Sequence, residues 1–114
     1  MTSVIRGSDN FDTAGGNAVK AWVNFNGTGT VAIRASYNVS SITDNGSGAY
    51  TVNFTNALAD ANYAVACATD PASDGVFILP KYGTATDSAM RVIVLNNTLG
   101  AFRDNDYNTF IAFR

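Results

Sequence analysis

Two closely spaced pairs of aspartates are the side chains of this chain with the clearest chemical potential. Asp70 and Asp74 enclose a proline, and Asp104 and Asp106 enclose Asn105. Two carboxylates can act as acid and base on a glycosidic bond, and an Asp-Asn-Asp run supplies ligand types found in calcium loops. That run lacks the glycine and the distal glutamate of an EF-hand, and aspartates in Gly- and Pro-rich loops mostly form turns. We therefore expect these aspartates to form turns; sugar or ion contacts are the second alternative, and hydrolysis is the third.

The residue inventory argues against nucleophilic and metal-dependent catalysis. The chain has no histidine and a single cysteine, Cys67. A serine or cysteine nucleophile would lack its usual base, and a zinc site would lack its usual ligands. Cys67 lies in an apolar run, and free cysteine is among the residues most often buried, so we expect an inert buried thiol. We predict no enzymatic activity, no cofactor and no metal ion.

The composition indicates one domain that lives in an assembly. A length of 114 residues fits a single domain. Charged residues make up 14% of the chain, against about 25% in typical domains, while hydrophobic residues make up 46%. The surface must therefore consist of Asn, Thr, Ser and Gly, which repel other copies weakly.

Charge and hydropathy exclude two classes of partner. The net charge is −2, and the seven Lys and Arg residues are scattered, so we expect no nucleic-acid binding. No apolar run approaches the ~20 residues that a membrane-spanning helix needs. The first residues lack the apolar core of a signal peptide. We expect a soluble protein made in the cytosol, without membrane insertion.

Short alternating segments separated by turn residues predict an all-β fold. Asn26-Gly-Thr-Gly29 and Asn45-Gly-Ser-Gly48 are typical hairpin turns because Asn and Gly accept positive φ. No window has a helical period of useful length. This spacing favours a sandwich or a barrel, and we predict an antiparallel β-sandwich of about six to eight short strands. The predicted strands cover residues 18–25, 31–35, 39–43, 50–54, 63–68, 76–82, 89–95 and 109–113.

Sequence also predicts the place of several strands. The nearly continuous apolar run 63–68 suggests a central strand. Pro80 cannot donate to a sheet ladder, which places 76–82 at an edge or a bulge. Segment 89–95 is apolar on both faces and is expected to be central or to face another subunit. Residues 1–17 show no period and form a predicted lead-in to a domain spanning 18–114.

Three aromatic residues are candidates for surface contacts. Trp22 alternates with Lys20 and Asn24, so we expect it to pack under the N-terminal segment or against another subunit. Stacking against a sugar ring is the alternative. Tyr82 and Tyr107 adjoin predicted loops, where they could cap the core or contact a glycan.

The segment from Lys20 to Val65 resembles the C-terminal module of bacteriophage and prophage tail-fibre proteins. The resemblance rests on AWVNFNGTGTVAIR from Ala21, on NVSSITDNGSG from Asn38 and on YTVNF from Tyr50, and the ending FIAFR is similar to the termini of those proteins. It implies a homotrimer at a fibre tip that binds the bacterial surface. The pattern of Tyr50, Val52 and Phe54 is also similar to H-type lectins, although no sugar-contact residue of those lectins has a match here.

These observations combine into one functional expectation. We expect a non-enzymatic, trimeric tail-fibre tip in the virion, made in the bacterial host cytoplasm, that binds a surface glycan such as lipopolysaccharide and contacts other tail-fibre proteins. The expected contacts lie in loops 70–75, 84–87 and 97–107. The best candidates are Asp74, Tyr82, Asp104, Asn105 and Tyr107. The rivals are a structural trimerisation or end-cap module without a ligand, and a depolymerase fragment.

Overall fold

The chain folds as an all-β sandwich, which confirms the predicted fold class. The structure, a computed structural model, describes residues 18–70, 76–96 and 100–114; the predicted lead-in 1–17 and Asp74 lie outside these residues. Within them, eight strands and one short 3-10 turn are present. Their bounds are β1 Val19–Asn26, β2 Ala32–Tyr37, β3 Val39–Asp44, β4 Ala49–Phe54, β5 Ala64–Thr69, β6 Val76–Lys81, η1 Tyr82–Thr84, β7 Ala89–Asn96 and β8 Asn108–Phe113.

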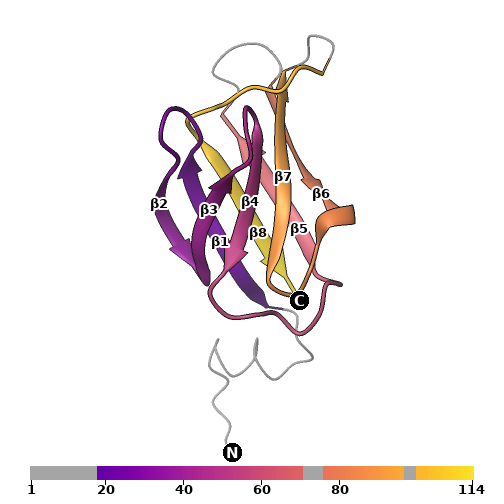
Figure 1. Cartoon of the computed structure of the whole chain (residues 1–114). Helices are drawn as coiled ribbons and strands as arrows, with labels where there is room; N and C mark the ends of the chain where they lie inside the picture. The colour runs from indigo at the N-terminus through magenta and orange to yellow at the C-terminus, as the bar shows by residue number, and fades with distance from the viewer. Residues whose placement is uncertain (1–17, 71–75, 97–99) are drawn as a thin grey trace, which may run out of the picture.

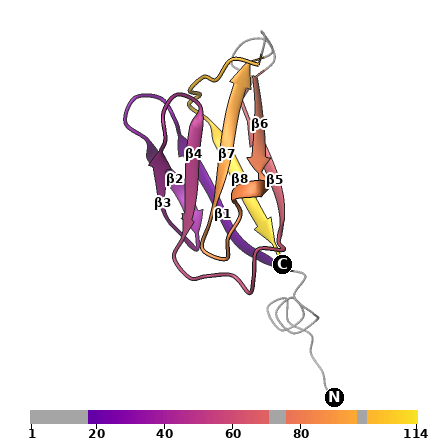
Figure 2. The same cartoon turned by 45° about the vertical axis from the view of Figure 1, so that its right-hand side comes forward.

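The strands form two four-stranded antiparallel sheets that pack face to face (Figures 1 and 2). Sheet A has the order β2-β1-β8-β5, and sheet B has the order β3-β4-β7-β6. The last strand, β8, therefore lies between β1 and β5 as a central strand of sheet A. The chain crosses from sheet A to sheet B between β2 and β3, where Asn38 is the single intervening residue.

Alternate side chains of the central strands fill the space between the sheets. On β4 the inward residues Tyr50, Val52 and Phe54 are buried, as the period-two pattern predicts. The ring of Phe25 from β1 meets the ring of Tyr50 edge to face, with centroids 5.2 Å apart. Burying one such side chain contributes about 1.5–3 kcal/mol, so this two-sheet contact is a major source of stability. Among the described residues, the other large side chains that are fully buried are Val23, Met90, Val92, Val94, Asn108 and Phe110.

Both predicted hairpin turns are present. The Asn26 side chain accepts a hydrogen bond from Thr28 N at 2.8 Å, which closes the turn between β1 and β2. The Asp44 carboxylate accepts one from Gly46 N at 2.9 Å in the turn between β3 and β4. These side-chain bonds are typical of Asx turns.

One predicted strand position is wrong. The apolar run 63–68 predicts a central strand, but β5 is the edge strand of sheet A, where β8 is its one partner among the described residues. Its apolar run is continuous because Ala64, Ala66 and Ala68 occupy the exposed face, while larger side chains face inward. Because alanine counts as apolar even where it is exposed, the sequence of β5 has the continuous apolar pattern of a strand buried on both faces. The edge position of β6 and the central position of β7 are confirmed.

Candidate functional site

Three connections of the sandwich lie at the end of the molecule opposite the two ends of the described domain (Figure 1). Ala18 and Arg114 pair through backbone hydrogen bonds, with Arg114 N 3.1 Å from Ala18 O. The β1–β2 turn, the β3–β4 turn and the segment 100–107 gather at the other end (Figure 1). We call this the loop end. Three of the predicted contact residues, Asp104, Asn105 and Tyr107, lie here.

Asp104 anchors the loop end to the core. One of its carboxylate oxygens lies 2.6 Å from the Tyr50 hydroxyl and 2.9 Å from Gly48 N. The same hydroxyl lies 2.9 Å from Gly27 O, so its single proton has two acceptors. Burial, reinforced by the Asp104 carboxylate, raises the pKa of Tyr50 far above the usual range. Tyr50 therefore remains a neutral hydrogen-bond donor.

Two glycines let segment 100–107 approach this anchor. A Cβ on Gly27 would lie 2.9 Å from Asn105 O, and one on Gly48 would lie 2.7 Å from Arg103 N. Gly48 also has a φ of 66°, which only glycine adopts readily. Gly48 O accepts a hydrogen bond from Val94 N at 2.7 Å, while Arg103 N donates to Val94 O at 3.0 Å. The segment is thus fixed against the end of β7.

Asn105 joins three parts of the loop end from the inside. Its side chain is 3% exposed, and its amide donates to Thr69 Oγ1 at 2.8 Å and to Asp70 O. Its backbone oxygen accepts hydrogen bonds from Gly27 N at 2.9 Å and from the Asn108 amide at 2.8 Å. The side-chain amide and the backbone oxygen of Asn105 are thus both occupied by hydrogen bonds within the protein. Asn105 therefore supports the loop end from beneath its surface.

Tyr107 is the predicted residue that reaches the surface of the loop end. Its side chain is 46% exposed, and the Arg34 guanidinium lies over its ring, 3.8 Å from the centroid. Arg34 also donates to Asp106 O and, at 3.4 Å, to the Asn24 side chain. A guanidinium stacked on an aromatic face is an orienting contact that lysine would not reproduce. The pair presents a cation, a ring and a phenol hydroxyl on one surface.

Tyr82 lies away from the other candidates. It belongs to η1, which follows β6 on the half of the molecule nearer the chain ends (Figure 1). Its hydroxyl accepts a hydrogen bond from Val65 N at 3.0 Å, which connects the edge of sheet B to the edge of sheet A. The structure therefore separates Tyr82 from Asp104, Asn105 and Tyr107.

Arg34 and Tyr50 are the loop-end residues that sequence reasoning missed. Arg34 stands in β2, and its contacts with Asp106 and Tyr107 join positions that are far apart in the chain. The alternation of β4 predicts that Tyr50 is buried. The alternation does not indicate that the Tyr50 hydroxyl donates a hydrogen bond to Asp104. No local signal could have identified either contact.

The chemistry of the remaining candidates is limited. Desolvation raises the pKa of the half-buried Cys67 thiol to about 12, so the thiol is protonated at neutral pH and weakly nucleophilic. In residues 18–70, 76–96 and 100–114, no three Asp, Glu, Cys or His side chains converge to hold a metal ion. Among the same residues, no helix has the length and apolar character needed to cross a membrane.

Comparison with known proteins gives no assignment. No protein-family model matches the chain, and neither a curated protein nor a solved structure gives a match. The fold and the loop end define the chain as an antiparallel β-sandwich of two four-stranded sheets, with a loop surface fixed to its core by Asp104 and Asn105.

Proposed function

We propose that this chain is the receptor-binding tip of a bacteriophage tail fibre, which binds a carbohydrate of the bacterial envelope without cleaving it. The observation that carries the proposal is the separation of the two ends of the sandwich. Ala18 and Arg114 pair at one end, while Arg34 on β2 and the loop residues Asp106 and Tyr107 lie together at the other. A tip attached at one end must present its binding surface at the opposite end. The sequence resemblance to tail-fibre modules supports the same function.

The chemistry of the loop end suits a polyol. Tyr107 offers a ring and a hydroxyl, and the Arg34 guanidinium offers several donors next to it. Asp106 is exposed and supplies a carboxylate acceptor. Because Asp104 and Asn105 hold the backbone beneath, these groups lose little freedom on binding, which improves affinity.

The outer face of sheet A supports an assembled tip. On strands β1, β8 and β5 of this face, one cross-strand row contains Trp22, Ile111 and Ala66, and the next contains Val19, Phe113 and Ala64. Neither row contains a carboxylate, an ammonium or a guanidinium group. Apolar patches of this kind mark protein contacts. We propose that this face packs against other copies in a homotrimer, within a virion whose neighbouring tail-fibre proteins contact the chain ends.

Trimerisation also makes weak glycan binding useful. A single shallow surface site of this kind is expected to bind weakly, and three linked copies increase the apparent affinity without any new contact. The same apolar face also favours the second candidate function, a structural trimerisation or end-cap module without a ligand. The two candidates agree on assembly and differ on the loop end.

Adsorption to cells separates these candidates. Fluorescently labelled protein is incubated with a panel of Gram-negative bacteria, with purified lipopolysaccharide as competitor. Tip function predicts saturable binding to at least one strain, competed by its lipopolysaccharide and strongly reduced by Tyr107→Ala and by Arg34→Ala. The matched control is Tyr82→Ala, which removes a similarly exposed tyrosine away from the loop end. Binding that survives the Tyr107 and Arg34 changes would contradict the proposed surface, and absence of binding would favour the end-cap function.

A further inference from the structure

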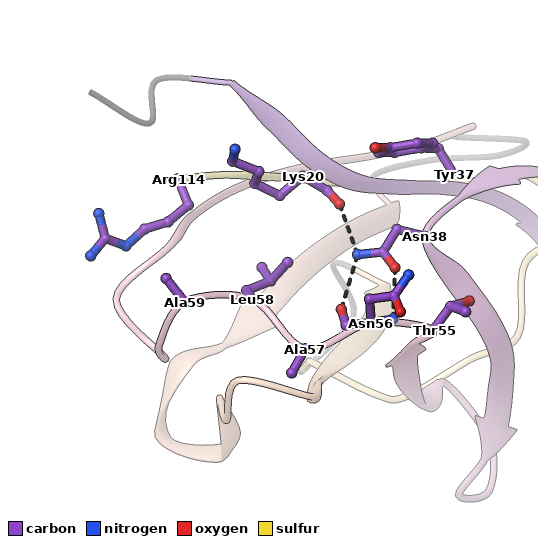
Figure 3. Close-up of a pocket in the computed structure, with 9 residues that line it drawn as sticks. All are labelled: Lys20, Tyr37, Asn38, Thr55, Asn56, Ala57, Leu58, Ala59 and Arg114. Carbon is purple, nitrogen blue, oxygen red and sulfur yellow. Dashed lines mark hydrogen bonds between the residues drawn. The ribbon is translucent and has the colours of Figure 1, made fainter. Parts of the chain in front are cut away.

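A pocket of about 570 Å³ lies at the end of the sandwich opposite the loop end. Its walls come from Lys20 on β1, Tyr37 on β2, the connection after β4 and Arg114 at the end of the described chain (Figure 3). Its volume falls within the range of small-molecule sites, about 300–1,000 Å³. No residue of the proposed loop-end surface lines it.

Asn38 fixes the pocket walls relative to one another. Its amide donates to Lys20 O at 3.0 Å and to Asn56 O at 3.1 Å, and its side-chain oxygen accepts from Asn56 N at 2.8 Å (Figure 3). Its φ is 55°, an uncommon left-handed conformation for a residue other than glycine, which asparagine tolerates better than most. A residue in such a conformation that saturates its side chain with hydrogen bonds holds two strands and a loop in one arrangement.

The wall formed by residues 57–59 is apolar, and a backbone hydrogen bond holds it in place. Leu58 is buried among the core residues, and its backbone N donates to Asp87 O at 2.8 Å. Ala57 and Ala59 flank it along the same wall. The pocket thus combines an apolar wall with the polar and aromatic groups of the opposite side, as ligand sites commonly do.

The two cationic side chains at the pocket rim, Lys20 and Arg114, differ in whether they form an ion pair. Arg114 is held by Asp60 in a two-pronged ion pair, with distances of 3.0 and 2.7 Å. Lys20 has no ion pair within the part of the chain that the structure describes. The Lys20 ammonium is therefore available to an anionic ligand at the pocket rim.

Tyr37, Thr55 and Asn56 supply further contacts. Tyr37 is 56% exposed at the pocket, so its ring is accessible. No hydrogen bond within the described residues uses the side chains of Thr55 or Asn56. An accessible ring, a hydroxyl and an amide complement the apolar and hydroxylated faces of a sugar, while Lys20 complements a carboxylate.

From these contacts we infer that the pocket binds an acidic saccharide, a sugar unit bearing a carboxylate. The carboxylate pairs with Lys20, the sugar ring lies against Tyr37, and its hydroxyl groups meet Thr55 and Asn56. The inference is independent of the loop end, so either site can fail in experiment without the other.

Titration of the full chain with D-glucuronate and with methyl α-D-glucoside tests the inference by NMR. Glucuronate at millimolar concentrations is expected to shift the amide resonances of residues 55–59, and the neutral glucoside is expected to bind about tenfold more weakly, since it lacks the charge-assisted contact. Acetate at equal concentration is not expected to compete. Equal binding of both sugars, effective competition by acetate, no binding at all, or shifts confined to the loop end would each overturn the inference.

Three substitutions complete the test. Lys20→Met keeps most of the aliphatic side chain and is expected to weaken glucuronate binding about tenfold or more. Lys81→Met is the matched control on the exposed face of β6 and is expected to change nothing. Tyr107→Ala, at the loop end, is also expected to leave glucuronate binding intact. Wild-type affinity in Lys20→Met, with the fold confirmed by circular dichroism, would overturn the inference.

Discussion

The hydroxyl of Tyr50 lies 2.6 Å from a carboxylate oxygen of Asp104, which follows it 54 positions later in the chain. This contact joins a core strand of sheet B to the segment that carries Asn105 and Tyr107. The rigidity of the loop end depends on it, because the same Tyr50 hydroxyl also approaches Gly27 O in the β1–β2 turn.

Removing that hydroxyl is expected to destabilise the fold. Tyr50→Phe keeps the ring packed against Phe25 but leaves Asp104 with one hydrogen-bond donor fewer in a partly buried place. A lost partner of a buried polar group costs about 1–3 kcal/mol, so we expect a decrease of that size in the free energy of unfolding by urea. Tyr107→Phe is the control, since no hydrogen bond of the described residues uses that hydroxyl. Equal stabilities of the two variants would contradict the proposed anchor.

Stability is expected to fall at alkaline pH. Burial raises the pKa of Tyr63 to about 12, with Asp87 adding to the effect, and raises that of Tyr50 further. In the unfolded chain both phenols ionise near pH ~10, so above that value the unfolded state binds fewer protons and is favoured. The stabilisation is complete below pH ~10 and is lost progressively as the pH rises toward the folded-state pKa values. Urea unfolding at pH ~8 and ~11 measures it, and Tyr50→Phe should lessen the difference. An unchanged free energy of unfolding would contradict both shifts.

Gly48 and Gly29 allow steric approach to be separated from backbone conformation. Both have positive φ, 66° and 60°, but a Cβ on Gly48 would press on Arg103 N at 2.7 Å, whereas one on Gly29 would have open space. Gly29→Ala is expected to lose about 1–2 kcal/mol from left-handed strain alone. Gly48→Ala should lose a further ~1–3 kcal/mol from the clash. Thermal unfolding of the two variants gives the comparison, and similar losses would show that segment 100–107 does not pack closely on Gly48.

A charge on the outer face of sheet A is expected to prevent assembly. Ala66 is exposed in the single chain, so Ala66→Glu should leave the fold intact. In a trimer packed through this face the carboxylate would be buried without a partner, which is strongly unfavourable. Sedimentation at micromolar concentration is expected to show a trimer for the wild type and a monomer for Ala66→Glu. Ala61→Glu, in the exposed connection before β5, should remain trimeric. A monomeric wild type would refute the assembly.

The fold could be predicted from sequence because its signals are local. Alternation of Tyr50, Val52 and Phe54 gives a strand with one buried face, and the Asn and Gly residues at 26–29 give a hairpin. The position of β5 could not be predicted, since exposed alanines and buried alanines look alike in a sequence.

The candidate site was predictable only in part. The segment containing Asp104, Asn105 and Tyr107 could be selected because Asp, Asn and Tyr near loops are suited to sugar contacts. Which of these residues are buried and which are exposed could not be predicted from the sequence. An asparagine whose amide is bonded to Thr69 looks the same in a sequence as one whose amide is free for a ligand. Arg34 could not be predicted as part of the site, because its stacking on Tyr107 depends on how β2 and segment 100–107 pack together in space. Direct ligand contact by these residues remains a prediction.

The pairing of Ala18 with Arg114 determines how the sandwich would carry mechanical load. In the proposed tip, a pull on Ala18 directed away from the loop end acts at the start of β1, which runs obliquely between the two ends of the sandwich (Figure 1). Because β1 is bonded to β2 on one side and to β8 on the other, the pull acts on two ladders of hydrogen bonds in shear. Many bonds must then fail together, whereas a pull across an edge strand would open them one at a time. The rate of forced unfolding should therefore be low in the direction in which a tethered tip is pulled.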